Sequence, residues 1–167
     1  MNFQFLIEKL VESEEFQKFK KENPEAYPFG GFFSFDLENK EISNQYTLDY
    51  FIPSFNKAVS FKLENGVEMI PITIQENQKF TQIGANYSFD FQEFQELIEK
   101  EMEKKEIKSK IQKILYSLQN YENEDYLLAT VFLSGFGILQ ANVKIQNKEI
   151  TKFEKKGFMD FLKIIKK

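Results

Sequence analysis

The spacing of apolar residues at the start of the chain predicts a pair of short helices. Apolar residues recur every three or four positions over residues 3–11, as on one face of an amphipathic helix. Ser13 is a candidate N-cap for a second short helix, which carries Phe16 and Phe19. Pro24 closes this region, because the residue before a proline avoids helical backbone angles.

An apolar and polar alternation with a period of two follows, and it predicts four strands between residues 31 and 74. Asn65 and Gly66 form a strong signal for a two-residue hairpin turn between the third strand and the fourth. Pro71 within the fourth strand favours a sheet edge or a bulge. The inward positions of the first three strands are Gly31, Phe33, Phe35, Leu37, Tyr46, Leu48, Tyr50, Ile52, Val59, Phe61 and Leu63.

The second half starts with a helical pattern that Asp90 caps, with an apolar stripe over residues 91–102. A second helical stripe over residues 107–118 is out of phase with the first, which predicts either a kink or two helices. Beyond the stripes, the pattern predicts three strands and a final amphipathic helix. These last four elements are expected at residues 127–133, 138–145, 150–153 and 158–165.

The fold class that this order predicts is α+β, with one or more antiparallel sheets and flanking helices. The expected order is one helical region, four strands, a helix or helix pair, three strands and a helix. Residues 1–167 form a single domain by length and by their even composition. Residues 1–89 and 90–167 have similar element orders, which is typical of a loose duplication.

Composition narrows the chemistry of the chain. It contains no Cys, His, Trp or Arg, so all 22 basic residues are Lys, and Phe is over-used with 20 copies, as in proteins from AT-rich genomes. These absences exclude thiolate and imidazole catalysis, cysteine-based metal sites and arginine clamps on phosphate. We expect no cofactor and no metal, although carboxylate chemistry remains open.

Hydropathy indicates the cellular compartment of the protein, and charge indicates the class of partner that it can bind. No secretory apolar region develops before Glu8, and the longest apolar run, residues 126–133, is too short to cross a bilayer. We therefore expect a cytoplasmic protein with no membrane span. Lysines crowd residues 104–113, but the glutamates among them and the net charge of −4 argue against a nucleic-acid partner.

Asp36 and Asp49 are the candidate catalytic pair. If the first hairpin pairs Phe35 with Tyr50, the two carboxylates face each other on the outer side of the sheet. A divalent cation or a shared proton would then relieve their repulsion. A different register would separate them. A carboxylate-dependent, metal-assisted hydrolase that uses this pair is the alternative function.

Four phenylalanines are the candidate binding residues, because they fall outside the inward alternation of their strands. They are Phe29, Phe32, Phe51 and Phe55. If they share the outer face of the sheet, that face is either covered by a helix or exposed as a contact patch. An intracellular binding module that recognises a protein or peptide through a sheet face or edge is the function we expect first.

Two stretches resemble known families. The first third of the chain contains Lys21-Glu22-Asn23-Pro24-Glu25-Ala26-Tyr27, Gly31-Phe32-Phe33, Asp36 and Leu48-Asp49-Tyr50-Phe51-Ile52-Pro53. Through these residues it resembles uncharacterised proteins of small-genome, AT-rich archaea. This resemblance implies no known activity. The second half is similar to a PepSY-type module, through a helix around residues 110–119, strands at 127–145 and the segment 143–150. It lacks the Asp-x-x-Thr-Gly of that family's turn. The resemblance implies binding or inhibition of peptidases.

Overall fold

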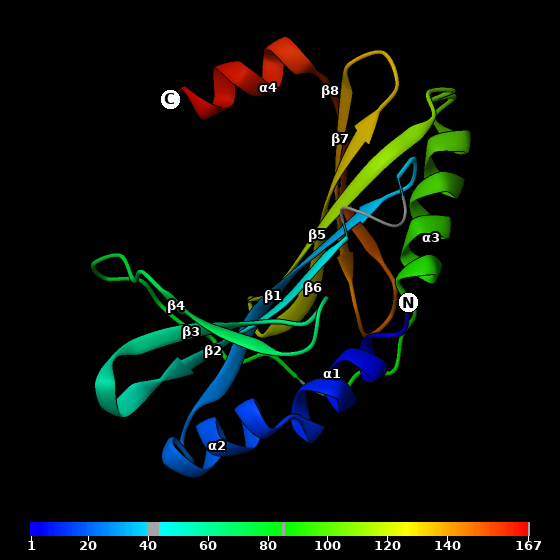
Figure 1. The fold of residues 1–167 in the computed structure, drawn as a ribbon. Helices are drawn as coiled ribbons and strands as arrows, with labels where there is room; N and C mark the ends of the chain where they lie inside the picture. The colour runs from blue at the N-terminus through cyan, green and yellow to red at the C-terminus, as the bar shows by residue number, and fades with distance from the viewer. Residues whose placement is uncertain (40–43, 85, 167) are drawn as a thin grey trace.

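The computed structural model describes residues 1–39, 44–84 and 86–166, and it has an α+β fold built on an antiparallel sheet (Figure 1). The fold class agrees with the sequence prediction. In chain order the elements are α1 (Phe3–Glu12), α2 (Glu14–Glu22), β1 (Tyr27–Asp36), β2 (Gln45–Ile52), the 3-10 helix η1 (Pro53–Phe55), β3 (Lys57–Lys62), β4 (Glu68–Ile72), α3 (Phe91–Lys104), β5 (Ile111–Tyr121), β6 (Glu124–Leu133), β7 (Gly137–Lys144), β8 (Ile150–Gly157) and α4 (Phe158–Ile165).

Side-chain caps explain where the helices begin. The Ser13 hydroxyl accepts a hydrogen bond from the Phe16 backbone N–H at 3.2 Å and donates one to the Leu10 carbonyl at 2.7 Å. One residue therefore ends α1 and starts α2, as its position predicts. Asp90 caps α3 in the same way, by accepting from the backbone N–H of Gln92 at 2.8 Å.

The sheet has eight strands in the order β4-β3-β2-β1-β5-β6-β7-β8. The strands of each half follow one another as a meander, and β1 and β5 pair at the centre. Pro71 lies in β4, which forms one edge as its sequence predicts. Each half thus consists of a helical part followed by four strands, although a duplication of one unit stays a prediction.

The helix predicted over residues 107–118 is wrong, because α3 ends at Lys104 and residues 111–121 form β5. Along β5 the buried positions are Ile111, Ile114, Tyr116 and Leu118. A bulge between Ile111 and Lys113 places the buried residues Ile111 and Ile114 three positions apart instead of two. This spacing produced the helical pattern. The last three buried residues alternate with a period of two, as in a strand. The resemblance to PepSY modules therefore loses the helix at residues 110–119 on which it partly rested.

Helices α1, α2 and α3 lie on one side of the sheet, where aromatic side chains fill the core (Figure 1). Phe61 of β3 packs edge-on against Phe16 and Phe19 of α2, with ring centroids 5.4 and 5.1 Å apart. Phe3 of α1 stacks on Phe89 at 4.9 Å. Much of the phenylalanine excess therefore serves packing between the helices and the sheet.

The opposite side of the sheet is here called the open face. Phe32 lies directly across from Thr47 and Ser117, and Ser117 lies across from Leu128, so these side chains share that face. The last helix, α4, packs against β7 and β8. It lies across the sheet from α3 (Figure 1). In the part of the chain that the structure describes, no helix is long and apolar enough to span a bilayer.

Candidate functional site

Phe32 is the exposed aromatic residue of a central strand. It lies in β1, the fourth strand of eight, and 36% of its surface is exposed. Its neighbours across the sheet, Thr47 and Ser117, are smaller and polar. Phe32 therefore lies partly exposed on the open face, and helices α1, α2 and α3 lie on the other side of the sheet (Figure 1).

Two hollows flank Phe32. The Asp49 hollow, of about 310 Å³, lies toward the start of β1 and the segment before α3. The Asn142 hollow, of about 380 Å³, lies over β5, β6 and β7. Both are lined by Phe32 and Ser117, so the two hollows meet at this pair of residues. Their volumes are at the lower end of the range for ligand sites.

Uncharged hydrogen-bonding groups dominate the two hollows. The Asn142 hollow is lined by Thr130, Gln140 and Asn142, with Lys152 as its charged residue. The Asp49 hollow adds the following polar side chains: Asp49, Gln78, Lys79, Thr81, Ser117, Gln119 and Asn120. Hydroxyl and amide groups can donate and accept hydrogen bonds, so this face can pair with the polar groups of a peptide backbone.

Asp49 is the acidic group of the first hollow, and it lies half-buried on β2. Burial raises the pKa of the Asp49 carboxyl, and a hydrogen bond with Ser60, its neighbour on β3, acts in the opposite direction. The desolvation of the charged carboxylate outweighs the hydrogen bond, so the proton is held more tightly than in water.

Phe29 and Phe51 are covered by a side chain that the sequence interpretation did not consider. Phe80 stacks on Phe51 with ring centroids 4.3 Å apart and meets Phe29 edge-on at 4.8 Å. The Tyr27 hydroxyl donates to the Phe80 carbonyl at 2.8 Å, which fixes the segment before α3 over β1. These two predicted binding residues therefore form a small cluster with Phe80 beside the Asp49 hollow.

Phe55 lies apart from the other three. It ends the 3-10 helix η1 between β2 and β3, and 64% of its surface is exposed. Of the four phenylalanines predicted to bind a partner, Phe32 is on the open face, Phe29 and Phe51 are under Phe80, and Phe55 is in a turn. They do not form one continuous patch.

The register of the first hairpin separates Asp36 from Asp49. Asp49 pairs with Gly30, and Asp36 lies opposite Lys113 of β5. The pairing of Phe35 with Tyr50, on which the candidate catalytic pair depended, does not occur, because Tyr50 pairs with Pro28. Asp36 instead accepts hydrogen bonds from the backbone N–H groups of Glu38 and Asn39, at 3.0 and 2.9 Å, so it holds the turn after β1. Among the described residues, no cluster of three or more acidic side chains could hold a metal ion.

The lysine-rich stretch is divided between α3, the segment after it and β5. Lys104 ends α3, Lys105 lies just after it, and Lys113 lies in β5. Glu101 pairs with the first two, at 3.5 and 3.9 Å. These ion pairs reduce the local positive field, and the absence of a nucleic-acid partner stays a prediction.

Ser117 and the polar residues of β7 are parts of the site that the sequence interpretation missed. Ser117 falls within the stripe read as a helix, so its place across from Phe32 could not be inferred. Gln140 and Asn142 alternate with the buried Leu139, Ala141 and Val143, and this outward position was a usable signal.

Comparison with known proteins supports the fold but not a function. No protein-family model matches the sequence, and no curated protein matches it. A crystal structure of a "putative lipoprotein" from Clostridium difficile 630 is similar, with a TM-score of 0.54 and 12% sequence identity. The likeness covers 86% of this chain and 91% of the other. It shows a shared fold, and the resemblances to archaeal proteins and to PepSY modules stay predictions.

Proposed function

We propose that the protein is an intracellular binding module that recognises an extended peptide segment of a partner protein through its open face. Phe32 carries this proposal, because an exposed phenylalanine in a central strand is flanked by two hollows lined with hydroxyl and amide groups. An aromatic anchor within a polar rim is the usual arrangement at protein-binding surfaces. The lack of cysteine fits a reducing compartment.

Four other exposed apolar side chains support a rival surface less well than Phe32 does. Val11 lies on α1, Met69 lies on the edge strand β4, and Phe136 lies in the turn after β6. Phe5 also lies on α1, where it lines a hollow of about 520 Å³ with Val67. Single exposed apolar residues at such places are normal in globular proteins. Phe32 differs because it projects from the middle of the sheet between two hollows.

The open face suits a partner better than the sheet edges do. A strand added at an edge needs free backbone groups, and Pro71 removes one donor from β4. The other edge strand, β8, carries Lys152, Lys155 and Lys156, which is typical of edges protected from pairing. The peptide is therefore expected to lie across the face, with one apolar side chain against Phe32.

The alternative function, a carboxylate-dependent hydrolase using Asp36 and Asp49, has no geometric support. The two residues lie on different strand pairings and line different hollows of the molecule. A shared cation or a shared proton requires two carboxylates within a few ångströms of each other.

Selection from a random peptide library displayed on phage tests the proposal, with the purified protein as bait. Peptides that bind should bind Phe32→Ser at least tenfold more weakly, since hot-spot aromatics contribute about 2 kcal/mol or more. Ser117→Tyr should also abolish binding, because its ring would fill both hollows at the point where they meet.

Phe136→Ser is the matched control. Phe136 is 82% exposed in the turn between β6 and β7, so its loss should leave peptide binding unchanged. Peptides that bind Phe32→Ser as well as they bind the wild type would overturn the proposal, and so would a selection that enriches none. Phe51→Ser is a poorer test, because Phe51 stacks on Phe80 and its loss would disturb folding.

A further inference from the structure

Asp49 is the diagonal neighbour of Phe32 on the open face. On β1, Gly30 lies two residues before Phe32, and Asp49 of β2 pairs with Gly30. Diagonal neighbours in an antiparallel pair lie about 7–8 Å apart. Asp49 and Phe32 both line the Asp49 hollow, of about 310 Å³, and Gly30 has no side chain to fill it.

The Asp49 carboxylate has no lysine partner among the residues that the structure describes. Lys62 lies diagonally from Asp49 on β3, and the exposed Lys79 lines the same hollow, but neither forms an ion pair with it. A lysine close to Asp49 would lower the pKa of its carboxyl. Burial instead raises this pKa, and the Ser60 hydroxyl is the group that opposes the rise. The negative charge of Asp49 is therefore not neutralised by a described side chain.

The hydrogen bond with Ser60 does not saturate the Asp49 carboxylate. An ionised carboxylate can accept about four hydrogen bonds, and the hydroxyl of Ser60 supplies one donor. Because Asp49 lines the hollow, its remaining acceptor capacity is available to a ligand there. A half-buried charge in this state lowers the stability of the fold, which is typical of residues kept for binding.

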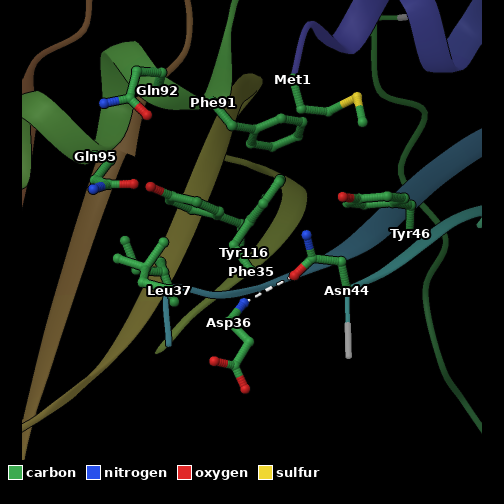
Figure 2. Close-up of a pocket in the computed structure, with 11 residues that line it drawn as sticks. Met1, Phe35, Asp36, Leu37, Asn44, Tyr46, Phe91, Gln92, Gln95 and Tyr116 are labelled. Carbon is green, nitrogen blue, oxygen red and sulfur yellow. Dashed lines mark hydrogen bonds between the residues drawn. The ribbon is translucent and has the colours of Figure 1, made fainter. Parts of the chain in front are cut away.

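Asp36 differs from Asp49 in this respect. It borders a cavity of about 430 Å³ between the start of α3 and strands β1, β2 and β5, and Figure 2 shows its carboxylate turned away from the aromatic rings of that cavity. The carboxylate accepts hydrogen bonds from the backbone N–H groups of Glu38 and Asn39, at 3.0 and 2.9 Å. Asp36 therefore serves the turn after β1, whereas Asp49 is left for a ligand.

We infer that the Asp49 hollow is the pocket for a cationic side chain, lysine or arginine, of the extended peptide that binds the open face. This inference rests on the proposed function. A lysine or arginine forms charge-assisted hydrogen bonds with a carboxylate. Its apolar stem would lie along Phe29 and Phe32, which line the same hollow. The modest volume suits one long side chain rather than a larger molecule.

The positions of Phe32 and Asp49 also set the spacing of the two anchor residues in the peptide. In an extended chain, side chains two residues apart point to the same side and are about 6.5 Å apart. This distance is close to the diagonal separation of Phe32 and Asp49. The apolar residue that contacts Phe32 should therefore have a lysine or arginine two positions away.

Peptides selected by phage display against the protein test this spacing. They should carry a lysine or arginine two positions from an apolar residue. Asp49→Asn should weaken their binding about tenfold, which corresponds to one charge-assisted hydrogen bond. After the basic residue of the peptide is replaced by norleucine, Asp49→Asn should have no further effect. Asp160→Asn is the matched control, since Asp160 is exposed on α4 and should leave binding unchanged.

Two outcomes of the selection would overturn the pocket and leave the proposed function intact. In the first, the peptides depend on Phe32 but carry no basic residue at this spacing. In the second, they carry one but bind Asp49→Asn as well as they bind the wild type. A selection that enriches no peptide would count against the proposed function, and the pocket is then tested by a small probe.

The small probe is n-butylguanidinium, and n-butylurea is its uncharged control. Titrated into labelled protein, n-butylguanidinium should shift the backbone amide signals of Asp49 and Phe32 and lower the pKa of Asp49, followed by carbon NMR of its carboxyl group. The urea should do neither. Equal effects of the two probes would overturn the pocket. So would a pKa of Asp49 below its usual value in the free protein, because a lysine of the protein would then already occupy the site.

Discussion

Phe80 and Phe51 stack almost in parallel, with ring centroids 4.3 Å apart and an angle of 11° between the ring planes. Phe51 lies in β2, whereas Phe80 belongs to the segment between β4 and α3. This segment is also held by the Ile83 backbone N–H, which donates to the Pro28 carbonyl at 3.0 Å. The stack therefore fixes one wall of the Asp49 hollow, which Gln78 and Lys79 complete.

Phe80→Ala tests this anchoring. The substitution removes two ring contacts and exposes Phe29 and Phe51, so we expect the free energy of unfolding to fall by about 2 kcal/mol. Urea unfolding followed by circular dichroism measures the change. Phe136→Ala should change the stability little, because that ring is 82% exposed. An equal loss in both variants would contradict the proposed role of the stack.

Asp49→Asn should stabilise the protein at neutral pH. Because burial raises the pKa of Asp49 in the folded state, the folded protein binds this proton more tightly than the unfolded chain does. The contribution of the Asp49 carboxyl to the free energy of unfolding is therefore fully present below the unfolded pKa of about 3.9. It is lost as the pH rises through the higher pKa of the folded state. The variant is neutral at every pH and avoids this decline.

The stability difference between Asp49→Asn and the wild type should accordingly be positive at pH 7 and vanish below about pH 3.9. Denaturant unfolding at a series of pH values gives the curve. Asp160→Asn is a matched control on an exposed position. A difference that is negative at pH 7 would show that the Asp49 charge is stabilised rather than disfavoured in the folded protein.

Gly31→Ala should weaken the centre of the sheet. A Cβ atom at this position would lie 2.8 Å from the Thr47 carbonyl oxygen and 3.0 Å from the ring of Phe33. The backbone of β2 or β1 would have to shift, so we expect a loss of about 1–3 kcal/mol in unfolding free energy. Gly137→Ala, whose nearest neighbours would be 3.4 Å away, should cost clearly less. Equal costs for the two variants would contradict the close approach at Gly31.

Ser13→Ala should remove the shared cap of α1 and α2. The hydroxyl bonds both Leu10 and Phe16, and the loss of such a cap costs about 1 kcal/mol. Ser13→Asp retains an acceptor for the Phe16 N–H and should restore most of that stability. Thermal unfolding distinguishes the variants, and an aspartate variant no more stable than the alanine variant would count against capping.

The sequence was sufficient for the elements that carry local signals. Ser13 marked the break between two helices, Asp90 marked the start of α3, and Pro71 marked an edge strand. Each of these residues acts on its own neighbourhood, through a side-chain cap or a missing backbone donor. Such effects do not depend on contacts that are distant in the chain.

The alternation of apolar and polar residues could not predict the register of the strands or the position of the bulges. The alternation along β1 and β2 correctly placed Phe33 and Leu48 on the inner face, because any even shift of register preserves the face. It could not place Asp49 opposite Gly30 rather than Asp36. The bulge near Ile111 likewise changed a period of two into one that resembles a helix, and this hid Ser117 and Tyr116.

The pairing of β1 with β5 also bears on how the chain folds. The other six strand pairings of the described sheet join strands that are consecutive in the chain, whereas this one brings Gly31 against Leu118. Closing a loop of that length is slow compared with forming a hairpin. Each meander should therefore assemble early from local contacts. The rate of reaching the native state should then depend on the pairing of β1 with β5, where Phe32 lies across from Ser117.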